Sequence, residues 1–388
     1  MLRFAATIIV VSLSLLTATF AVAQTIQTDI SAQYRPRLEV DKRFAAETGV
    51  YVTHRARLAF GLQGDGWRVR IEPQDVRAWG SEASPVAYAA NVDLHQGFAE
   101  WNSGQGTQLR IGRQSIAHLN QRLIGGLNWA QQGRSFDAVR LSGSQDRVRW
   151  DIWTAPLADT APRRSRDGAI ATGLLQWDNA GRRAALLAVG DMNRDARLYR
   201  TTTGLHTSGK LLAPLGYQAE AYVQVGHREG EEIRAYLAKA EVRYTVADHS
   251  LKPTIRVGYD VLSGQTDDTT AFDTLHGTNH AFYGFMDAFL NLPAHTGGLG
   301  LQDLYVRATA TLGTVRTYLA IHHLRTGPGN EGTFGTEVDL VATVPVAPGV
   351  TWETGAAVLL ADDAFATVRP TAPTYPLWGY SMLNVALQ

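Results

Sequence analysis

The sequence predicts an all-β protein whose fold is a transmembrane antiparallel β-barrel of about 18 strands. Three observations lead to this prediction. Apolar and polar residues alternate in runs that recur along the chain, the polar positions of these runs are rich in arginine, and a short apolar leader precedes them. Alternation with a period of two is typical of strands that have one apolar face each.

The first 23 residues have the layout of a secretory signal peptide. Arg3 gives a basic start, residues 4–22 are mostly apolar and uncharged, and Ala21 and Ala23 are the small residues of a cleavage site. We therefore expect residues 1–23 to be a signal peptide and residues 24–388 to form one barrel domain. The alternative is an uncleaved membrane anchor. No later window of about 18 residues is apolar enough for a transmembrane helix.

Composition excludes several classes of protein. The chain of 388 residues has no net charge and no cysteine, which excludes a disulfide scaffold, thiolate zinc sites and cysteine nucleophiles. Of its 36 basic residues, all are arginine except Lys42, Lys210, Lys239 and Lys252. The planar guanidinium suits carboxylates and phosphates. The alternative explanation for this bias is the base composition of the genome.

The alternating runs set the number of strands. In residues 24–38, Ile26, Ile30 and Tyr34 share one face, whereas Asp29 and Arg35 lie on the other. Similar runs cover residues 50–63, 66–74, 107–114, 146–154, 251–261 and 333–345, the last with Phe334 on its apolar face. We count about 18 runs, those near 170–191 and 197–210 being ambiguous, and about 20 residues per strand and connection suit a membrane barrel.

A soluble sandwich also alternates, but three further features favour the barrel. Arginine-rich faces are costly in a dry core but acceptable in a wet lumen. The segment 378–387 alternates and would close the sheet, removing its edge. Aromatic residues lie near strand ends, as in the interfacial girdles of membrane barrels: Tyr34, Trp67, Trp101, Trp150, Tyr217, Tyr244, Tyr259 and Trp378.

Arginines dominate the polar faces. By parity, this face holds Arg35, Arg37, Arg55, Arg57, Arg68, Arg70, Arg110, Arg147 and Arg149. A row of such side chains in a narrow passage would focus potential and concentrate anions. The alternative is that acids such as Glu72, Glu100 and Asp151 pair with them, so that the arginines only solvate the lumen. Both interpretations stay open at this point.

Two segments break the alternation. Arg113–Ser135 contains three glycines and is too long for a tight turn and too polar for a lipid-facing strand, so we interpret it as a loop folded into the lumen as a constriction. It would carry Arg113, Arg122 and Arg134. The alternative is an ordinary extracellular loop.

The second segment, Phe272–Asp287, reads FDTLHGTNHAFYGFMD. His276 and His280 are spaced for a metal only on a helix, which the intervening residues disfavour, and no nucleophile motif such as GxSxG is present. We expect a turn or inward loop in which Asp273 and Asn279 satisfy backbone groups. A second interpretation makes Phe282, Tyr283 and Phe285 a surface for stacking sugars. The acidic runs 264–269 and 361–364 are interpreted as solvated turns.

The order of motifs resembles a known family. Residues 74–80 read QDVRAWG, and residues 110–141 read RIGRQSIAHLNQRLIGGLNWAQQGRSFDAVRL; with Phe272–Asp287 they resemble the alginate-export family of outer-membrane barrels. The resemblance implies an 18-stranded barrel in the outer membrane. It also implies passage of an anionic polysaccharide through an arginine-rich pore, possession of the fold being the safer inference.

We therefore expect a non-enzymatic porin of the outer membrane that conducts an anionic solute or polysaccharide. Its expected partners are outer-membrane lipid, the cargo and periplasmic export proteins, with no nucleic acid, metal, cofactor or catalytic residue. The alternatives are a general porin for small solutes, an outer-membrane enzyme acting on lipid or glycan, and a soluble β protein. The candidate pore-lining residues are Arg55, Arg57, Arg68, Arg70, Arg77, Arg110, Arg113, Arg122, Arg134, Asp273 and Asn279.

Overall fold

The computed structural model describes residues 26–82, 92–157, 168–246 and 248–387. The expected signal peptide, residues 1–23, lies outside the described residues. Across the described ranges, no helix is both long and apolar enough to cross a membrane.

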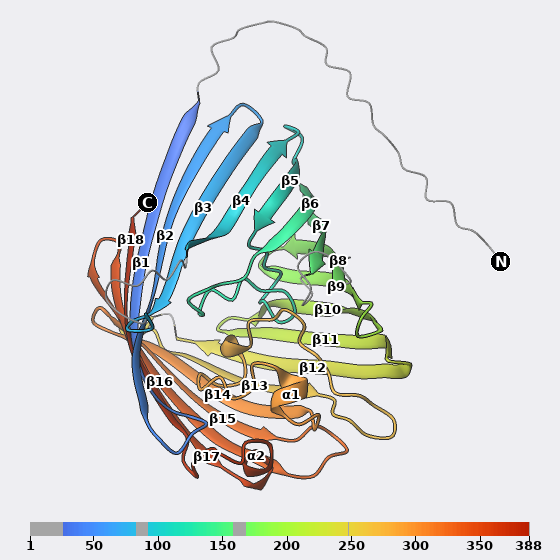
Figure 1. Ribbon diagram of the computed structural model, residues 1–388, viewed down its shortest axis with the longest axis vertical. Helices are drawn as coiled ribbons and strands as arrows, with labels where there is room; N and C mark the ends of the chain where they lie inside the picture. Colours follow the sequence, from blue (N-terminus) through green and yellow to red (C-terminus); the bar gives the residue numbers. More distant parts are fainter. Residues whose placement is uncertain (1–25, 83–91, 158–167, 247, 388) are drawn as a thin grey trace, which may run out of the picture.

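Eighteen strands and three short helices make up the described chain (Figure 1). In order they are β1 (Gln27–Lys42), β2 (Gly49–Gly64), β3 (Trp67–Ala78), β4 (Val92–Asn102), β5 (Thr107–Gln114), β6 (Phe136–Gln145), β7 (Val148–Leu157), β8 (Gly168–Asn179), β9 (Arg182–Asn193), β10 (Leu198–Leu212), β11 (Leu215–Arg228), β12 (Glu231–Thr245), β13 (Thr254–Leu262), η1 (Asn279–Ala281), α1 (Leu292–His295), β14 (Leu301–Leu312), β15 (Val315–Arg325), β16 (Thr333–Ala347), β17 (Val350–Ala361), α2 (Asp363–Val368) and β18 (Leu377–Leu387).

The strands form one closed antiparallel sheet. Each strand pairs with its neighbours in sequence, and β1 also pairs with β18, from Ala32 opposite Leu387 to Lys42 opposite Leu377. Among the described strands, closure leaves none with an unpaired edge, because β1 and β18 pair with each other. The predicted all-β fold, the strand number and the closing role of the last segment are thus confirmed.

The two ends of the barrel differ in their connections. At one end, two-residue turns such as 65–66 and 146–147 join the strands, and β1 begins and β18 ends there. Figure 1 shows these ends of β1 and β18 at the upper left. The other end carries the long connections, including residues 115–135 and 263–300. We call them the short-turn end and the long-loop end.

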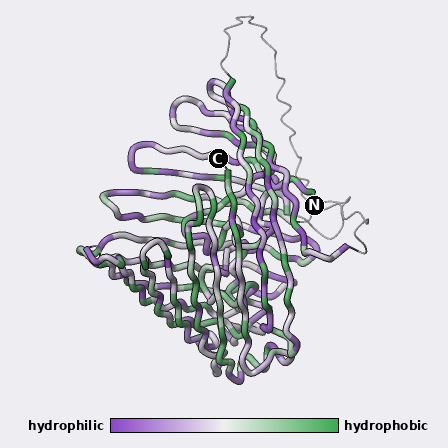
Figure 2. Tube along the Cα trace, turned by 90° about the vertical axis from the view of Figure 1, so that its left-hand side faces the viewer, coloured by the Kyte–Doolittle hydropathy of each residue, from purple (hydrophilic) through white to green (hydrophobic). Residues whose placement is uncertain are grey.

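The alternation along each strand produces an apolar outer wall. Leu58, Ile152, Leu186, Val257 and Leu340 are all exposed and lie on different strands around the barrel. Figure 2 shows hydrophilic and hydrophobic residues alternating along the strands. A closed barrel with so continuous an apolar exterior fits a lipid bilayer rather than bulk water.

Two aromatic residues face inward against expectation. Phe334 was assigned to the outer face, but a register shift beside Gly335 places it inside, fully buried. Trp378 was assigned to the interfacial girdle, but its indole is buried inside the barrel and donates to Glu39 at 3.1 Å. A bulge changes the phase of alternation, and parity cannot tell an inward tryptophan from a girdle residue.

The interior is not uniformly polar. Toward the long-loop end, the inward side chains of β6–β9 and β11–β18 are largely apolar, and they pack with side chains of the long connections into one buried cluster that includes Ile116, Trp153, Leu237, Met286 and Leu359. Toward the short-turn end the inward residues are polar, and many of them are charged. The barrel therefore has a filled half and a polar half.

The outer wall yields a test of membrane placement. Leu340→Arg puts a charge in the middle of β16 on the outer face and should lower the free energy of unfolding by roughly 2–4 kcal/mol, as arginine does at a bilayer midplane. Leu312→Arg is the matched control, because Leu312 ends β14 beside a turn and should cost about 0–1 kcal/mol. Urea unfolding in lipid vesicles measures both, and equal losses would contradict the placement.

Candidate functional site

Two long connections enter the barrel and pair with each other inside it. We call residues 115–135 the first lumenal loop and residues 263–300 the second lumenal loop. The amide of His276 donates to the carbonyl of Leu123 at 2.9 Å, and the amide of Gly125 donates to the carbonyl of His276 at 2.8 Å. Ile124 and His276 form a short parallel bridge. The inward folding expected of both segments is confirmed, and the two loops form one unit.

Arg122 of the first lumenal loop joins this unit to the barrel wall. Its guanidinium, 1% exposed, lies 2.7 Å from Asp260 of β13 and 3.4 Å from Glu220 of β11. It also donates to the Tyr283 hydroxyl at 2.7 Å and lies 3.8 Å from the centre of the Phe282 ring. Burial opposes the charge, but Asp260 and the other neighbours outweigh it and hold the pKa of Arg122 well above its ordinary value. Arg122 therefore stays charged and holds the first lumenal loop against β11 and β13.

Other predicted site residues also hold the loops in place. Arg134 donates to the carbonyls of Gly125 at 3.1 Å and Gly277 at 3.2 Å. Asp273 pairs with Arg200 of β10 at 2.6 Å. Asn279 is buried and donates to the Thr274 hydroxyl at 2.6 Å and the Leu290 carbonyl at 2.8 Å. Arg134 and Asn279 thus order the loops by hydrogen bonds within and between them, and Asp273 binds the second lumenal loop to the barrel wall.

The aromatic residues of the second lumenal loop are mostly enclosed. Phe282 and Tyr283 are buried, so the expected sugar-stacking surface does not form from these two. Phe285 stacks on Tyr318 of β15, with 5.0 Å between ring centres. Among the described residues, no group of three or more His, Asp or Glu side chains is arranged to hold a metal ion. Phe282 and Tyr283 are thus part of the buried cluster inside the barrel.

Two carboxylates of β16 receive the tip of the second lumenal loop. The amide of Met286 donates to Glu337 at 2.7 Å, and the amide of Phe285 donates to Asp339 at 3.3 Å. Both carboxyl groups are fully buried. Backbone donors are the partners that such buried acceptors require, so the fold of the tip and the wall depend on each other.

Arginines of β1 and β2 contact the first lumenal loop. Arg35 donates to the carbonyl of Asn128 at 2.8 Å, and Arg57 donates to the carbonyl of Gln132 at 3.2 Å. Arg55 lies between them and is fully buried. The predicted row of arginines on the lumenal face exists here, but the loop covers it.

Farther toward the short-turn end, arginines pair with acids of the same strand or of a nearby strand. Arg68 lies 3.4 Å from Asp29, and Arg70 lies 2.8 Å from Glu72. Arg110 donates to Glu100 at 2.7 Å. For these three arginines the acid-pairing alternative describes the structure, since each has a carboxylate partner.

Two predicted pore-lining residues lie on the outer face instead. Arg77 is opposite His54 in the β2–β3 register, one position out of phase with the lumenal Arg55. It pairs with Asp75, to which His54 also binds at 2.9 Å. Since opposite residues of paired strands share a face, Arg77 and its partners face outward.

The prediction that Arg113 lines the pore is wrong for the same reason. It is opposite Asp137 in the β5–β6 register and lies 3.3 Å from that carboxylate, whose side chain is 65% exposed. The lumenal Arg110 is three positions earlier, and an odd separation along a strand changes the face. Arg113 therefore belongs to the exterior of the barrel.

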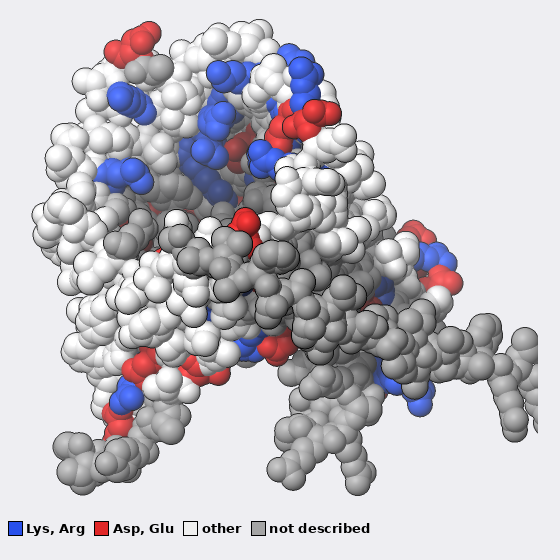
Figure 3. All heavy atoms as spheres, turned by 90° about the horizontal axis from the view of Figure 1, so that it is seen from above, with Lys and Arg blue, Asp and Glu red and all other residues white. Residues whose placement is uncertain are grey.

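A basic pocket opens into the lumen at the short-turn end. It has a volume of about 620 Å³ and lies along the ends of β7 through β13. Six basic residues and two acidic residues line it: Arg149, Arg182, Arg183, Lys210, Arg243 and Arg256, with Asp178 and Glu241. Figure 3, which views this end, shows basic side chains gathered in a hollow.

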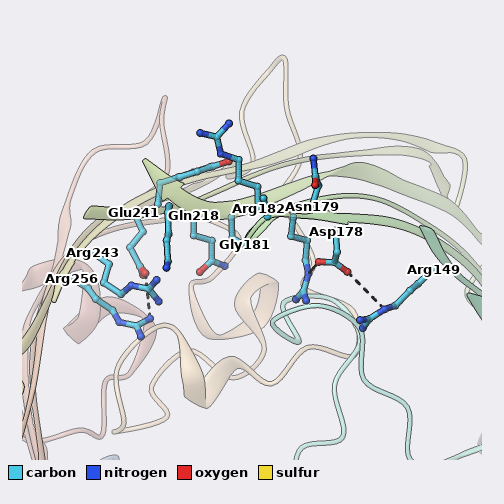
Figure 4. A pocket seen from close by; sticks show the side chains of 15 residues that line it. Arg149, Asp178, Asn179, Gly181, Arg182, Gln218, Glu241, Arg243 and Arg256 are labelled. Carbon is cyan, nitrogen blue, oxygen red and sulfur yellow. Dashed lines mark hydrogen bonds and ion pairs between the residues drawn. The ribbon is translucent and has the colours of Figure 1, made fainter. Parts of the chain in front are cut away.

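The acids of the pocket neutralise only part of this charge. Asp178 binds Arg183 at 2.9 Å and lies 3.9 Å from Arg149, and Glu241 lies 3.5 Å from Arg256 (Figure 4). The Arg149 side chain is nevertheless 65% exposed. Of these basic residues, the sequence pattern singled out only Arg149, because the others come from separate hairpin ends. Basic residues at successive strand ends are the signal that could have found them.

Comparison with known proteins places the chain in a family. A family model described as Alginate export matches residues 25–375. The chain belongs to the alginate-export family. It is an outer-membrane β-barrel porin, as the resemblance in the sequence implied. A comparison with curated proteins finds no match. In outer-membrane barrels the short turns are periplasmic and the long loops extracellular, which assigns the short-turn end to the periplasm.

Solved Pseudomonas aeruginosa proteins share the fold of this alginate-export family member. OpdK with vanillate is 12% identical, with a TM-score of 0.63 over 92% of this chain and 98% of that chain. OccK11 (OpdR) is 9% identical, with a TM-score of 0.63 over 93% and 96%. OprD is 13% identical, with a TM-score of 0.60 over 92% and 95%. Similarity at this level concerns the fold.

The Arg122 contacts predict a loss of loop stability on substitution. Arg122→Met leaves Glu220 and Asp260 buried without their cation, which should cost roughly 3–5 kcal/mol of the stability of the lumenal unit. Limited proteolysis of the folded barrel should then cleave the first lumenal loop much faster. Arg147→Met on an exposed turn is the control and should change stability by less than about 0.5 kcal/mol. Equal resistance of the first lumenal loop to proteolysis in both variants would contradict the proposal that Arg122 holds it in place.

His276 predicts a pH dependence of the loop pairing. Burial, and next the charge of Arg134, lower the pKa of His276 to about 4 from an ordinary value of 6.5. Between pH 6.5 and 4, His276 therefore binds a proton in the unfolded loop but not in the folded loop. The contribution of His276 to the stability of the folded loops is present above pH 6.5 and is lost as the pH falls toward 4. Conductance in planar bilayers should rise over this window in the natural protein and stay flatter in His276→Gln. Identical pH profiles would rule out the dependence on His276.

Proposed function

We propose that the protein passively conducts hydrophilic anionic solutes across the outer membrane. The observation that carries the proposal is the basic pocket at the periplasmic mouth, where six basic residues face two acids in a chain with no net charge. A pore attracts anions through local charge. Low-dielectric walls around such a cluster focus its potential and raise the local concentration of the opposite charge.

The arrangement suits weak binding followed by release. Arg149, Arg243 and Arg256 belong to different strands, so an anion entering the pocket meets several partners in succession. Conduction requires sites that are favourable enough to enter and weak enough to leave. Toward the extracellular end, the paired lumenal loops narrow the route and select by size. No covalent step is needed for this task.

An alginate-like polysaccharide is the finer form of the proposal, and it rests on family membership. The second candidate is a general porin for small solutes with the same fold. It is favoured by the packing of the lumenal loops, which contact β1 and β2 through Arg35 and Arg55 and β11 and β13 through Arg122. A polymer has to displace this packing, whereas a small solute does not. An enzyme acting on lipid or glycan has no supporting constellation among the described residues.

Charge selectivity in planar bilayers tests the proposal. With a KCl gradient, the reversal potential should show preference for chloride over potassium. The triple variant Arg149→Ser, Arg243→Ser, Arg256→Ser should reduce the permeability ratio by roughly tenfold, since a focused cluster raises local ion concentration by that order. Cation preference in the natural protein would overturn the proposal.

A matched control separates local from total charge. Arg113 and Arg234 lie on the outer face of the barrel, paired with Asp137 and Glu232, so Arg113→Ser and Arg234→Ser remove charge without touching the pocket. These variants should keep the natural selectivity. If they lower it as much as the pocket variants do, then net charge rather than the pocket sets the preference.

A further inference from the structure

Five successive residues of the first lumenal loop, Asn128–Gln132, turn their carbonyl oxygens toward arginines of the barrel wall. Arg35 donates to the carbonyls of Asn128 at 2.8 Å, Trp129 at 2.9 Å and Ala130 at 3.1 Å. We call this stretch the acceptor segment. Its row of oxygens presents partial negative charge to β1 and β2, as an anionic chain would.

The remaining carbonyls complete the row. Arg55 lies within 3.3 Å of the carbonyls of Asn128 and Ala130 and 3.5 Å of that of Gln131. Arg57 donates to the carbonyl of Gln132 at 3.2 Å, and Arg37 to that of Trp129 at 3.2 Å. Four arginines of two adjacent strands thus share one piece of neutral backbone.

The central pair of arginines has no acid in direct contact. Arg35 is directly opposite Arg55 in the β1–β2 register, and like charges opposite each other on a sheet repel. Neither forms an ion pair with any acid in the described ranges. The nearby acids have other direct partners: Glu39 binds Arg37 at 2.9 Å, Glu72 binds Arg70 at 2.8 Å, and Glu353 accepts from the Tyr380 hydroxyl at 2.8 Å.

Arg55 is the less satisfied member of the pair. Its Nε is buried and has no hydrogen-bond partner, and its contacts to the loop carbonyls are longer than those of Arg35. Its Nη2 finds only the neutral amide oxygen of Gln33, at 2.8 Å. A fully buried cation with partial compensation is costly, and a carboxylate would satisfy it better than carbonyl dipoles do.

We propose that Arg35 and Arg55 form a latent binding site for the carboxylates of the transported solute, and that the acceptor segment occupies it at rest. The proposal rests on the anion-conducting function above and adds a mechanism of entry. Charge-assisted bonds from arginine to carboxylate are roughly twice as strong as neutral ones and often bidentate. Because the anion binds only when the segment has left, its binding shifts the loop toward an open state.

The acceptor segment is attached to the chain at both ends, and this attachment determines which anions can displace it. A loop anchored at both ends competes at an effective concentration of the order of millimolar, so a lone carboxylate displaces it poorly. An oligomer with a carboxylate on each unit offers several groups to Arg35, Arg55 and Arg57 at once. The site therefore favours a polyanionic chain over a single small acid and over any neutral polymer.

Labelling at Ala130 reports the displacement directly. The chain has no cysteine, Ala130 is half-buried, and it meets the arginines through its carbonyl alone, so Ala130→Cys introduces a unique thiol at small cost. In lipid vesicles, an impermeant maleimide should label it slowly. An oligogalacturonate should accelerate labelling about fivefold or more, the lower range of coupling between linked sites, whereas a neutral dextran oligomer of equal length should not.

Two controls exclude general loosening of the protein. Asp195→Cys, on an exposed turn between β9 and β10, should be labelled equally fast with and without the oligomer. Adding Arg35→Gln and Arg55→Gln to Ala130→Cys should raise the basal labelling rate and abolish the effect of the oligomer. If the oligomer still accelerates labelling in that background, then the two arginines are not the site.

A reversible lock keeps the proposal testable if the arginine variants do not fold. The Gln131 amide donates to the Thr53 hydroxyl at 3.0 Å, so the thiols of Thr53→Cys and Gln131→Cys lie within reach of a short bis-methanethiosulfonate cross-linker, which a reductant removes. Oligogalacturonate should increase conductance in the reduced channel and not in the cross-linked one. Equal responses in both states would overturn the proposal.

These experiments distinguish a failure of the latent site from a failure of the proposed anion conduction. Anion selectivity with no effect of oligogalacturonate on Ala130→Cys would sink the latent site and leave the anion channel standing. Loss of both anion selectivity and the oligomer effect would remove the two together. Acceleration by oligogalacturonate alone, reversed by the arginine substitutions, supports the site.

Discussion

Every backbone donor and acceptor within a bilayer needs a partner in the protein, and this requirement organises the rest of the structure. It forces β1 to pair with β18, and closure divides all strand residues into an outer and an inner set. The apolar set faces lipid, so the polar set, with most of its arginines, is confined to the lumen. A wall built in this way concentrates charge that then needs compensation inside the barrel.

Compensation comes from different sources along the barrel. Near the periplasm, acids on the same strand or on an adjacent strand neutralise Arg70 and Arg110, and the surplus of basic residues forms the open pocket. Toward the outside, the lumenal loops supply the partners: carbonyls for Arg35 and, through Arg122, a cation for Asp260. The loops fill the extracellular half because they also bring apolar side chains to an apolar wall.

Apolar and polar residues alternate with a period of two along each strand, and this pattern depends only on residues close together in the sequence. The fold and the lumenal position of Arg55 could therefore be predicted from the sequence. The inward loops could be predicted because they break that period. Parity assigns Arg77 outward, against its prediction as a pore-lining residue. The prediction for Arg113 is wrong because Arg113 belongs to β5 and not to the segment that breaks the alternation, and the prediction for Phe334 is wrong because a bulge leaves no mark in composition. The basic pocket contains residues of several hairpins. Their spacing in the sequence and the alternation along single strands do not show which strand ends lie close together in the curved barrel.

The outward position of Arg113 and Asp137 has a consequence for the surrounding membrane. β5 has 8 residues, fewer than the about 9–11 that a strand needs to cross hydrocarbon, and its apolar exterior ends at Ile111. Lipid beside β5 and β6 therefore meets a shorter hydrophobic wall than lipid beside β16, which has 15 residues. Hydrophobic mismatch of this kind thins the adjacent bilayer, so we expect the lipid around the barrel to be thinner beside β5 than beside β16.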